Sequence, residues 1–258
     1  MNDNQKIIVS LTSFPAALPY AIQAIRSILQ GSMLPDKIVL YLDTFQFPVG
    51  KLPPELEALK NACAIFEVRF DPIEMRSYKK LVPALKDFPD DIIITIDDDI
   101  HYPTNLLKDL VDLHKRLPEA IIAHRVRKIR PDKPYSKWRK YKWYDFIFKK
   151  YHFNYRAMQT GVGGVLYPPH VLDERMLDPT LFTQLAPTCD DVWFWAAAVS
   201  HGTYVVPVPF GKTSASEVGK PARLSLKTVN LQPDDDRNRE ALDKILTYYP
   251  AIGKRLKK

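Results

Sequence analysis

The segment Asp91-Ile92-Ile93-Ile94-Thr95-Ile96-Asp97-Asp98-Asp99 decides how this chain folds. A run of β-branched residues between polar ones predicts a strand that is covered on both faces, as in a mainly parallel sheet. Open parallel sheets bind ligands beyond the carboxyl ends of their strands, which is where the three aspartates stand. Because hard oxygen ligands suit Mg²⁺ and Mn²⁺, the cluster predicts a divalent metal site at a sheet edge.

Strand-like and helix-like segments alternate along the rest of the chain. The strand pattern recurs at 7–11, 37–42, 65–70, 119–124 and 202–208, and the helix pattern at 19–30, 53–59, 79–86, 103–117 and 190–199. This alternation predicts an α/β fold with a mainly parallel central sheet flanked by helices. We expect one domain over 1–210, in which the segment 125–155 is an irregular insertion, and a C-terminal extension over 211–258.

Composition limits the cellular compartments in which this protein is expected. The chain has 258 residues and two cysteines, Cys63 and Cys189, which are too few for a disulfide scaffold or a cysteine zinc site. No apolar run approaches the roughly 20 residues that a membrane-spanning helix needs, and the first residues lack the pattern of a signal peptide. We therefore expect a cytoplasmic protein, with contact to the inner face of the membrane as an option.

Basic residues concentrate in the segment 125–150 and in the tail 254–258, and they contribute to a net charge of +7. Solvated surface is one interpretation of such segments. Aromatic residues between the basic ones could instead stack on sugar rings of an anionic glycan, and the alternatives are an acidic membrane surface and, ranked last, single-stranded nucleic acid. These aromatic residues are Trp138, Tyr141, Trp143, Tyr144 and Tyr151.

A second acidic cluster, Asp190-Asp191, opens an apolar helix and is followed by Val192 and Trp193. One of the two carboxylates could serve only as an N-cap, because helix N-termini favour negative charge. The other, beside aromatic surface, is a candidate general base whose pKa burial and a nearby metal would tune.

Two further segments contain residue types that bind substrates. Gly161-Val162-Gly163-Gly164 lacks the lysine and hydroxyl residue of a P-loop, so it is either a simple bend or a place where backbone lies close beneath a substrate. Arg76-Ser77-Tyr78-Lys79-Lys80 precedes a predicted helix, where lysines and backbone donors could neutralise phosphate oxygens.

The order of these motifs between Ile7 and Val208 resembles the nucleotide-sugar-dependent glycosyltransferases of the GT-A fold. It is most similar to the small, family 2-like bacterial enzymes that build capsule, lipopolysaccharide or other surface polysaccharides. The resemblance implies a donor-binding half over 1–100 and an acceptor-binding half over 101–210. The matching segments are 7–15, Ser77-Tyr78-Lys79-Lys80, Thr95-Ile96-Asp97-Asp98-Asp99, Thr160-Gly161-Val162-Gly163-Gly164-Val165 and Asp190-Asp191-Val192-Trp193.

The resemblance also implies a role for individual residues. The donor nucleotide would be held by Thr12, Ser13, Asp43, Lys79, Lys80, Asp97 and Asp98, and the acceptor by Gly163, Gly164 and Trp193. Asp191 would be the catalytic base and Asp190 its acceptor-binding partner, although such families usually carry glutamate at the position of Asp190. Asp99 and Asp97 would bind Mn²⁺ or Mg²⁺, with His201, Asn230 or the segment 234–236 as candidates for a third ligand.

The implied reaction transfers a sugar from a nucleoside diphosphate, uridine diphosphate first, to a hydroxyl of a glycan or glycolipid with inversion. Two alternatives stay open. Clustered aspartates and a basic patch would also suit a metal-dependent phosphohydrolase or nuclease. A protein on the same scaffold could instead bind nucleotides or carbohydrates without catalysis.

Overall fold

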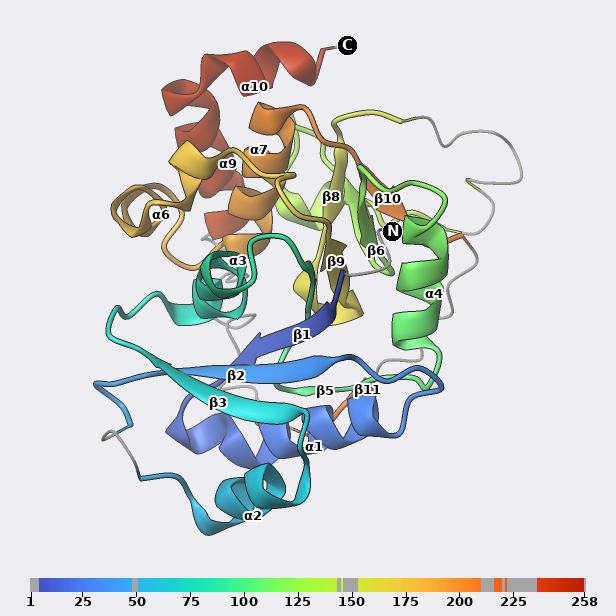
Figure 1. Cartoon of the computed structure of the whole chain (residues 1–258). Coiled ribbons are helices and arrows are strands. Elements are labelled where there is room, and N and C mark those ends of the chain that lie inside the picture. The colour runs from blue at the N-terminus through green and yellow to red at the C-terminus, as the bar shows by residue number, and fades with distance from the viewer. Residues whose placement is uncertain are drawn as a thin grey trace.

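The computed structural model describes residues 5–47, 51–142, 145, 153–209, 216–219, 221 and 236–257. A central sheet has the strand order β10-β6-β9-β4-β1-β2-β3 (Figure 1). The strands are β1 Ile7–Thr12, β2 Lys37–Asp43, β3 Phe66–Asp71, β4 Ile92–Thr95, β6 Ile121–Ala123, β9 Val165–Tyr167 and β10 Val205–Pro207. Strand β9 runs antiparallel to β4 and β6, whereas the other pairings of these strands are parallel. The predicted α/β class with a mainly parallel sheet is confirmed.

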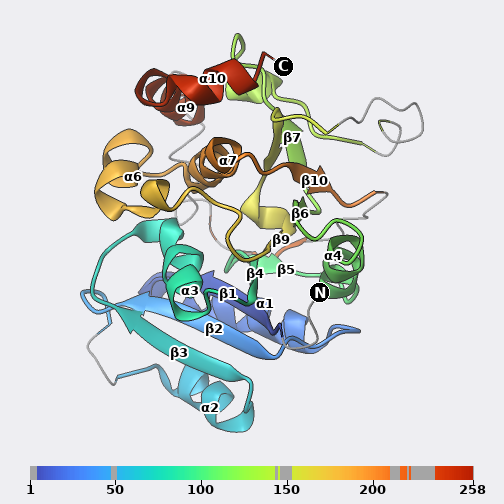
Figure 2. The ribbon, with the colours of Figure 1, turned by 45° about the horizontal axis from the view of Figure 1, so that its top comes forward.

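Helices cover both faces of this sheet, as Figure 2 shows. On one side lie α1 Leu18–Leu29, α2 Pro54–Ala62 and α4 Leu106–His114. On the other side lie α3 Val82–Asp87, α6 Pro179–Leu185, α7 Asp190–His201, α9 Arg237–Tyr248 and α10 Pro250–Arg255. The architecture is compatible with a Rossmann-like domain, in which one apolar core lies on each face of the sheet.

The alternation of side chains along each strand explains the long isoleucine run. Ile92 and Ile94 face the core that contains α1 and α4, whereas Ile93 faces the core that contains α7. All three side chains are fully buried. Burying such a side chain stabilises the fold by about 1.5–3 kcal/mol, so both faces of the strand need apolar residues.

Where it is described, the predicted insertion 125–155 contains regular structure. Strand β7 (Val126–Lys128) pairs antiparallel with β8 (Ala157–Gln159), and Trp138 is fully buried. The indole Nε1 of Trp138 donates to the carbonyl oxygens of Arg130 and Lys133 at 3.0 Å each. Trp138 is therefore a core residue, and its expected stacking on sugar rings is wrong. Trp143, Tyr144 and Tyr151 lie outside the described residues.

The described part of the C-terminal extension belongs to the same core as the main domain. Leu242 and Ile245 of α9 pack in the core that also holds α7. The Arg255 guanidinium donates to the backbone oxygens of Val199 and Ser200 at the end of α7, which is a favourable place for a cation. A second small sheet joins β5 (Ile100–His101) to β11 (Ser216–Glu217).

One difference in helix boundaries concerns the two lysines of the predicted helix 79–86. Lys79 and Lys80 lie in a 3₁₀ helix, η2 (Arg76–Lys80), and α3 begins only at Val82. Pro83 has no N–H to donate, and its ring fits only the first turn of a helix, so α3 cannot extend back to Lys79. Within the described residues, no helix combines the length and the apolar composition that crossing a bilayer requires.

Candidate active site at the carboxyl edge of the sheet

Four parallel strands bring polar residues to one edge of the sheet. β1 ends before Ser13, β2 ends at Asp43, β4 ends just before Asp97, and β6 ends just before Arg125. Because β9 runs the opposite way, the glycine segment that precedes it arrives at the same edge. Ligands of open α/β sheets bind beyond this edge.

Lys80 stands at the centre of the charged groups there. Its Nζ lies 2.8 Å from Oδ1 of Asp97 and 2.9 Å from Oδ2 of Asp190, and its side chain is only 8% exposed. The contact with Asp190 is an ion pair without the directionality of a hydrogen bond. Asp190 is not the N-cap of α7, since Cys189 holds that position and makes no side-chain cap. Lys80 thus ties the end of β4 to the start of α7.

The electrostatics of Lys80 follow from its partners. Burial alone would lower the pKa of its ammonium group. The charges of Asp190, Asp97 and Asp191 outweigh burial and raise this pKa well above its usual value. Lys80 is therefore a permanent cation among three carboxyl groups.

Asp191 is the least compensated of these carboxyl groups. Its Oδ1 accepts a hydrogen bond of 2.9 Å from the backbone N–H of Gly161. Burial, and then the charge of Asp190, raise the pKa of Asp191 to about 7, although Lys80 opposes the shift. The side chain retains partial solvent access. A carboxyl group with a pKa near neutrality suits a general base.

Gly161 fits into this cluster only because it has no side chain. A Cβ at this position would lie 2.5 Å from Nζ of Lys80 and 2.8 Å from Oδ1 of Asp97. Its N–H is also the donor to Asp191. Gly161 was not among the predicted site residues, although its place at the start of the glycine segment is the signal that could have identified it.

Two predicted donor residues on the β1 side make different contacts. The hydroxyl of Ser13 donates to Oδ2 of Asp98 at 2.7 Å, so these two residues lie together at the candidate site. The hydroxyl of Thr12 donates instead to the carbonyl oxygen of Tyr41 at 2.8 Å and ties β1 to β2. The backbone N–H of Asp97 donates to the Tyr102 hydroxyl at 2.8 Å, a contact that the sequence did not predict.

Lys79 and Asp43 form a second, separate ion network. Nζ of Lys79 lies 3.0 Å from Oδ2 of Asp43 and 2.7 Å from Oε2 of Glu74. The side chains of Lys79 and Asp43 are 3% and 1% exposed. Both charges are used within the protein, which corrects the expectation that these two residues contact the donor directly.

The residues at the carboxyl edge of the sheet can be compared with the ligands that a divalent metal requires. Carboxylate oxygens are the right donors, and Mg²⁺ is commonly held by one or two carboxylates together with substrate phosphates. In the described ranges, no group of three or more acidic, histidine or cysteine residues is placed to hold a metal. A metal site that includes Asp97 and Asp99, as the sequence predicts, would therefore need oxygens of a substrate to complete it.

The three predicted acceptor residues are buried. Trp193 is fully buried, and its Nε1 donates to the carbonyl oxygen of Met176 at 2.6 Å. A Cβ on Gly163 would lie 2.7 Å from the backbone N of Arg125, and Gly164 has a φ of +77° beside Leu106. Both glycines are thus required by packing of the chain against itself. The expectation that Gly163, Gly164 and Trp193 contact an acceptor is corrected accordingly.

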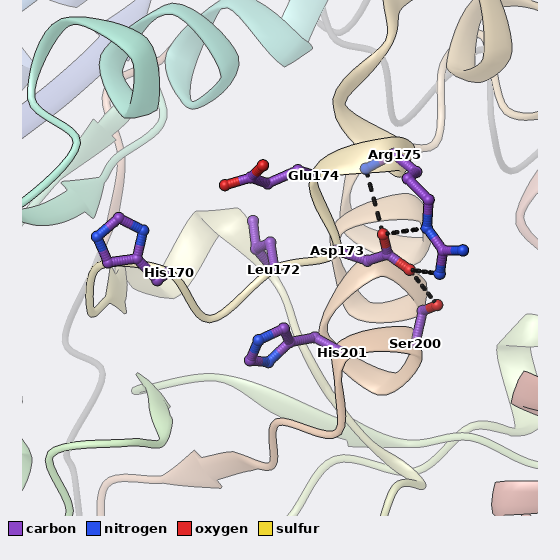
Figure 3. Close-up of a pocket in the computed structure, with 7 residues that line it drawn as sticks. All are labelled: His170, Leu172, Asp173, Glu174, Arg175, Ser200 and His201. Atoms are coloured by element: carbon purple, nitrogen blue, oxygen red, sulfur yellow. Dashed lines mark hydrogen bonds and ion pairs between the residues drawn. The ribbon is translucent and has the colours of Figure 1, made fainter.

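His201 is too far from the aspartates to act as a metal ligand with them. It ends α7, whereas Asp190 begins this 12-residue helix, so the two lie roughly 16 Å apart. His201 instead lines a cavity of about 500 Å³ with His170, Leu172, Asp173, Glu174, Arg175 and Ser200 (Figure 3). Its Nδ1 lies 2.9 Å from Oγ1 of Thr203. Asn230 and residues 234–235 lie outside the described ranges, and Asp236 caps α9.

Arg125 and Gln159 are further residues near the site that were not predicted. Gln159 is fully buried, and its Nε2 donates to the backbone oxygen of Asp191 at 3.3 Å. Arg125 lies beside Gly163 and within electrostatic reach of Asp191 and Asp97. Its position directly after β6 was the available signal, because β6 ends at the same edge as β4.

Comparison with known proteins adds no family assignment. No protein-family model matches this sequence, and no curated protein matches it. The function is therefore argued from the fold and from the geometry of the carboxyl edge.

Proposed function

We propose that this chain is a glycosyltransferase of surface-polysaccharide synthesis. It would move a sugar from a nucleoside diphosphate, with uridine diphosphate the first to test, to a hydroxyl of an acceptor glycan or glycolipid. One observation carries the proposal: Asp191, whose pKa is about 7, is oriented by the Gly161 N–H beside Lys80 and Asp97 at the ligand-binding edge of the sheet.

Asp191 accepts the proton in this reaction. The N–H of Gly161 fixes Oδ1 of Asp191, which leaves the second carboxylate oxygen for the proton of the acceptor hydroxyl. The hydroxyl oxygen forms a bond to the anomeric carbon as the bond from that carbon to the phosphate oxygen breaks. The bonding electrons leave with the diphosphate, and attack from the opposite face inverts the configuration. General-base assistance of this kind contributes about 10²–10⁴-fold to a rate.

Lys80 positions the acidic groups around the reacting centre. Its ion pairs hold Asp97, from the end of β4, and Asp190, from the start of α7, on either side of one ammonium group. A divalent cation bound by Asp99 and Asp97 would supply positive charge for the oxygens of the diphosphate. Ser13 and Asp98 lie on the β1 side of the same edge, where the nucleoside is proposed to bind.

The test combines donor binding with transfer. A panel of nucleotide sugars is screened by thermal shift with and without Mn²⁺, since a bound donor raises the apparent stability. With the donor found, Asp191→Asn should keep the donor affinity and lose about 10²–10⁴-fold of the transfer rate. Asp112→Asn, on the exposed side of α4, is the matched control and should change neither quantity.

Each outcome separates the transferase from its alternatives. Transfer at a near wild-type rate by Asp191→Asn would reject Asp191 as the base. Release of inorganic phosphate from phosphate esters, with no product from any nucleotide sugar, would favour a phosphohydrolase. Donor binding with no release of nucleoside diphosphate would favour a binding protein.

A further inference from the structure

Arg125 is fixed against the glycine segment of the candidate site. Its backbone oxygen accepts hydrogen bonds from the N–H of Thr160 at 2.9 Å and from the Thr160 hydroxyl at 3.2 Å. Gly163 permits this approach, because a Cβ there would lie 2.7 Å from both N and Cβ of Arg125. The start of the Arg125 side chain is therefore held in place by its neighbours.

The guanidinium group of Arg125 forms no ion pair with any of the described residues. In the part of the chain that the structure describes, its Nε is buried and has no hydrogen-bond partner, and no carboxylate forms an ion pair with it. An arginine carries five N–H donors, and leaving buried donors unpaired is costly. Such a side chain is matched to a group that arrives with the substrate.

Arg127 repeats the pattern two residues further along. Arg125 directly precedes β7 and interacts electrostatically with Arg127 of that strand, whereas Val126 between them is buried in the core. The Nε of Arg127 is also buried without a hydrogen-bond partner among the described residues. Its Nη1 donates to the carbonyl oxygen of Trp138 at 2.6 Å, and its guanidinium lies 4.5 Å from the ring centroid of Tyr135. These contacts orient Arg127 without neutralising it.

The charged groups around Arg125 affect the pKa of its guanidinium group. Burial, and then the charge of Arg127, lower the pKa of Arg125, while Tyr135, Asp191 and Asp97 oppose this. Two guanidinium groups therefore interact unfavourably, and none of the described residues supplies a carboxylate that pairs with either of them. A negatively charged ligand would relieve both the repulsion and the unpaired donors.

We propose that Arg125, with Arg127 beside it, forms an anion site next to Asp191 that takes a phosphate or carboxylate group of a substrate. The planar fork of donors suits both groups, which it can bind through two parallel hydrogen bonds. The anion has two possible sources, the diphosphate of the donor or an acidic group of the acceptor. The inference deepens the proposed function and rests on it for these two sources, whereas the site itself is tested by binding alone.

The experiment measures the binding of inorganic pyrophosphate by calorimetry at low salt. Arg125→Gln should weaken pyrophosphate binding about tenfold or more, because one charge-assisted pair is lost. Arg125→Lys keeps the charge but loses the fork, so it should weaken binding by a smaller factor and serves if Arg125→Gln does not fold. Arg26→Gln, which changes an exposed arginine on α1, is the matched control and should bind as the wild type does.

A second arm separates the two sources of the anion. Glucuronate and glucose are compared by NMR titration of the wild type and of Arg125→Gln. Weaker pyrophosphate binding assigns the site to the diphosphate, whereas unchanged pyrophosphate binding with loss of the preference for glucuronate assigns it to an acidic acceptor. If Arg125→Gln changes neither, the anion site is rejected. A protein that binds pyrophosphate through Arg125 but transfers no sugar would retain the anion site and reject the transferase.

Discussion

Two neighbouring lysines hold two different ion networks at the same edge of the sheet. Lys79 pairs with Asp43 and Glu74, and Lys80 pairs with Asp97 and Asp190. Each lysine thus contacts two carboxylates and is almost fully buried. The networks differ in the other hydrogen-bond donors that contact their carboxylates. This difference distinguishes a supporting network from a candidate catalytic one.

The Lys79 network is completed by backbone donors. Oδ1 of Asp43 accepts from the N–H groups of Phe45 at 3.0 Å and Gln46 at 2.7 Å. Burial alone would raise the pKa of Asp43, but the hydrogen bond from the Gln46 N–H, and then the contacts with Glu74 and Lys79, hold it below its usual range. The carboxylate of Asp43 is therefore a stable anion that fixes the turn after β2.

The Lys80 network leaves negative charge in excess. One ammonium group serves Asp97 and Asp190, and Asp191 beside them receives a single N–H from Gly161. The pKa of Asp191 is raised to about 7 by burial and by Asp190. The pKa values of two acids at one sheet edge are thus shifted in opposite directions. Asp191, which receives fewer hydrogen bonds than Asp43, can gain and lose a proton near neutral pH.

The largest change in stability is expected when each of the two lysines is replaced in turn. Lys80→Met should lower the free energy of unfolding by about 3–5 kcal/mol, because buried carboxylates lose their cation. Lys79→Met should cost about 1–3 kcal/mol, since Asp43 keeps its backbone donors and Glu74 can be hydrated. Urea unfolding at pH 7 measures both.

The control for the lysine pair is Lys108→Met, which removes an exposed ion pair on α4 and should change stability by less than about 0.5 kcal/mol. Equal losses for Lys79→Met and Lys80→Met would show that the backbone donors of Asp43 do not compensate for its lysine. In that case the contrast between the two networks would not hold.

The sequence predicted the first half of the fold well, because its strands are buried on both faces. The isoleucine run of β4 and the apolar spacing of α1 leave little choice of structure, and both elements lie within two residues of the predicted positions. The segment after Val126 was harder to predict. Its strand β7 is short, and its partner β8 is about thirty residues further along the chain. Local periodicity cannot report such a pairing.

The sequence indicated several residues that lie together in the structure, but not how their side chains pair. Asp97, Asp190, Asp191 and Lys80 do come together, since each stands at the end or start of an element at one edge. Which lysine pairs with which carboxylate depends on the 3₁₀ geometry of η2, and this is set by Pro83 and the start of α3. Trp193 was misplaced because an aromatic residue in the first turn of a helix can face either the core or the site.

A smaller effect is expected from adding one methyl group at the centre of the Lys80 network. Gly161→Ala places a Cβ 2.5 Å from Nζ of Lys80, which two ion pairs prevent from moving away easily. The free energy of unfolding should fall by about 1–3 kcal/mol. Gly253→Ala in α10, where the nearest atom is Cδ2 of Leu246 at 3.9 Å, should instead raise it by about 0.5–1 kcal/mol. Opposite signs in urea unfolding would confirm that Lys80 is held rigidly, whereas a gain for both variants would contradict it.

The most specific effect is the pH dependence of stability that the two acids impose. The folded chain keeps the proton of Asp191 up to a pKa of about 7, whereas the unfolded chain releases it near the ordinary aspartate pKa of 3.8. Asp191 therefore makes folding less favourable as the pH rises from about 4 to about 7. Asp43, whose pKa is lowered, contributes stability above the unfolded pKa and loses it as the pH falls through the folded one.

In urea unfolding across pH 3–8, Asp191→Asn should gain stability relative to the wild type between pH 4 and 7 and then level off. Asp43→Asn should instead lose stability relative to the wild type above about pH 4. Parallel curves for wild type and Asp191→Asn would show that Asp191 is an ordinary surface acid, and the contrast between the two networks would then lie only in their geometry.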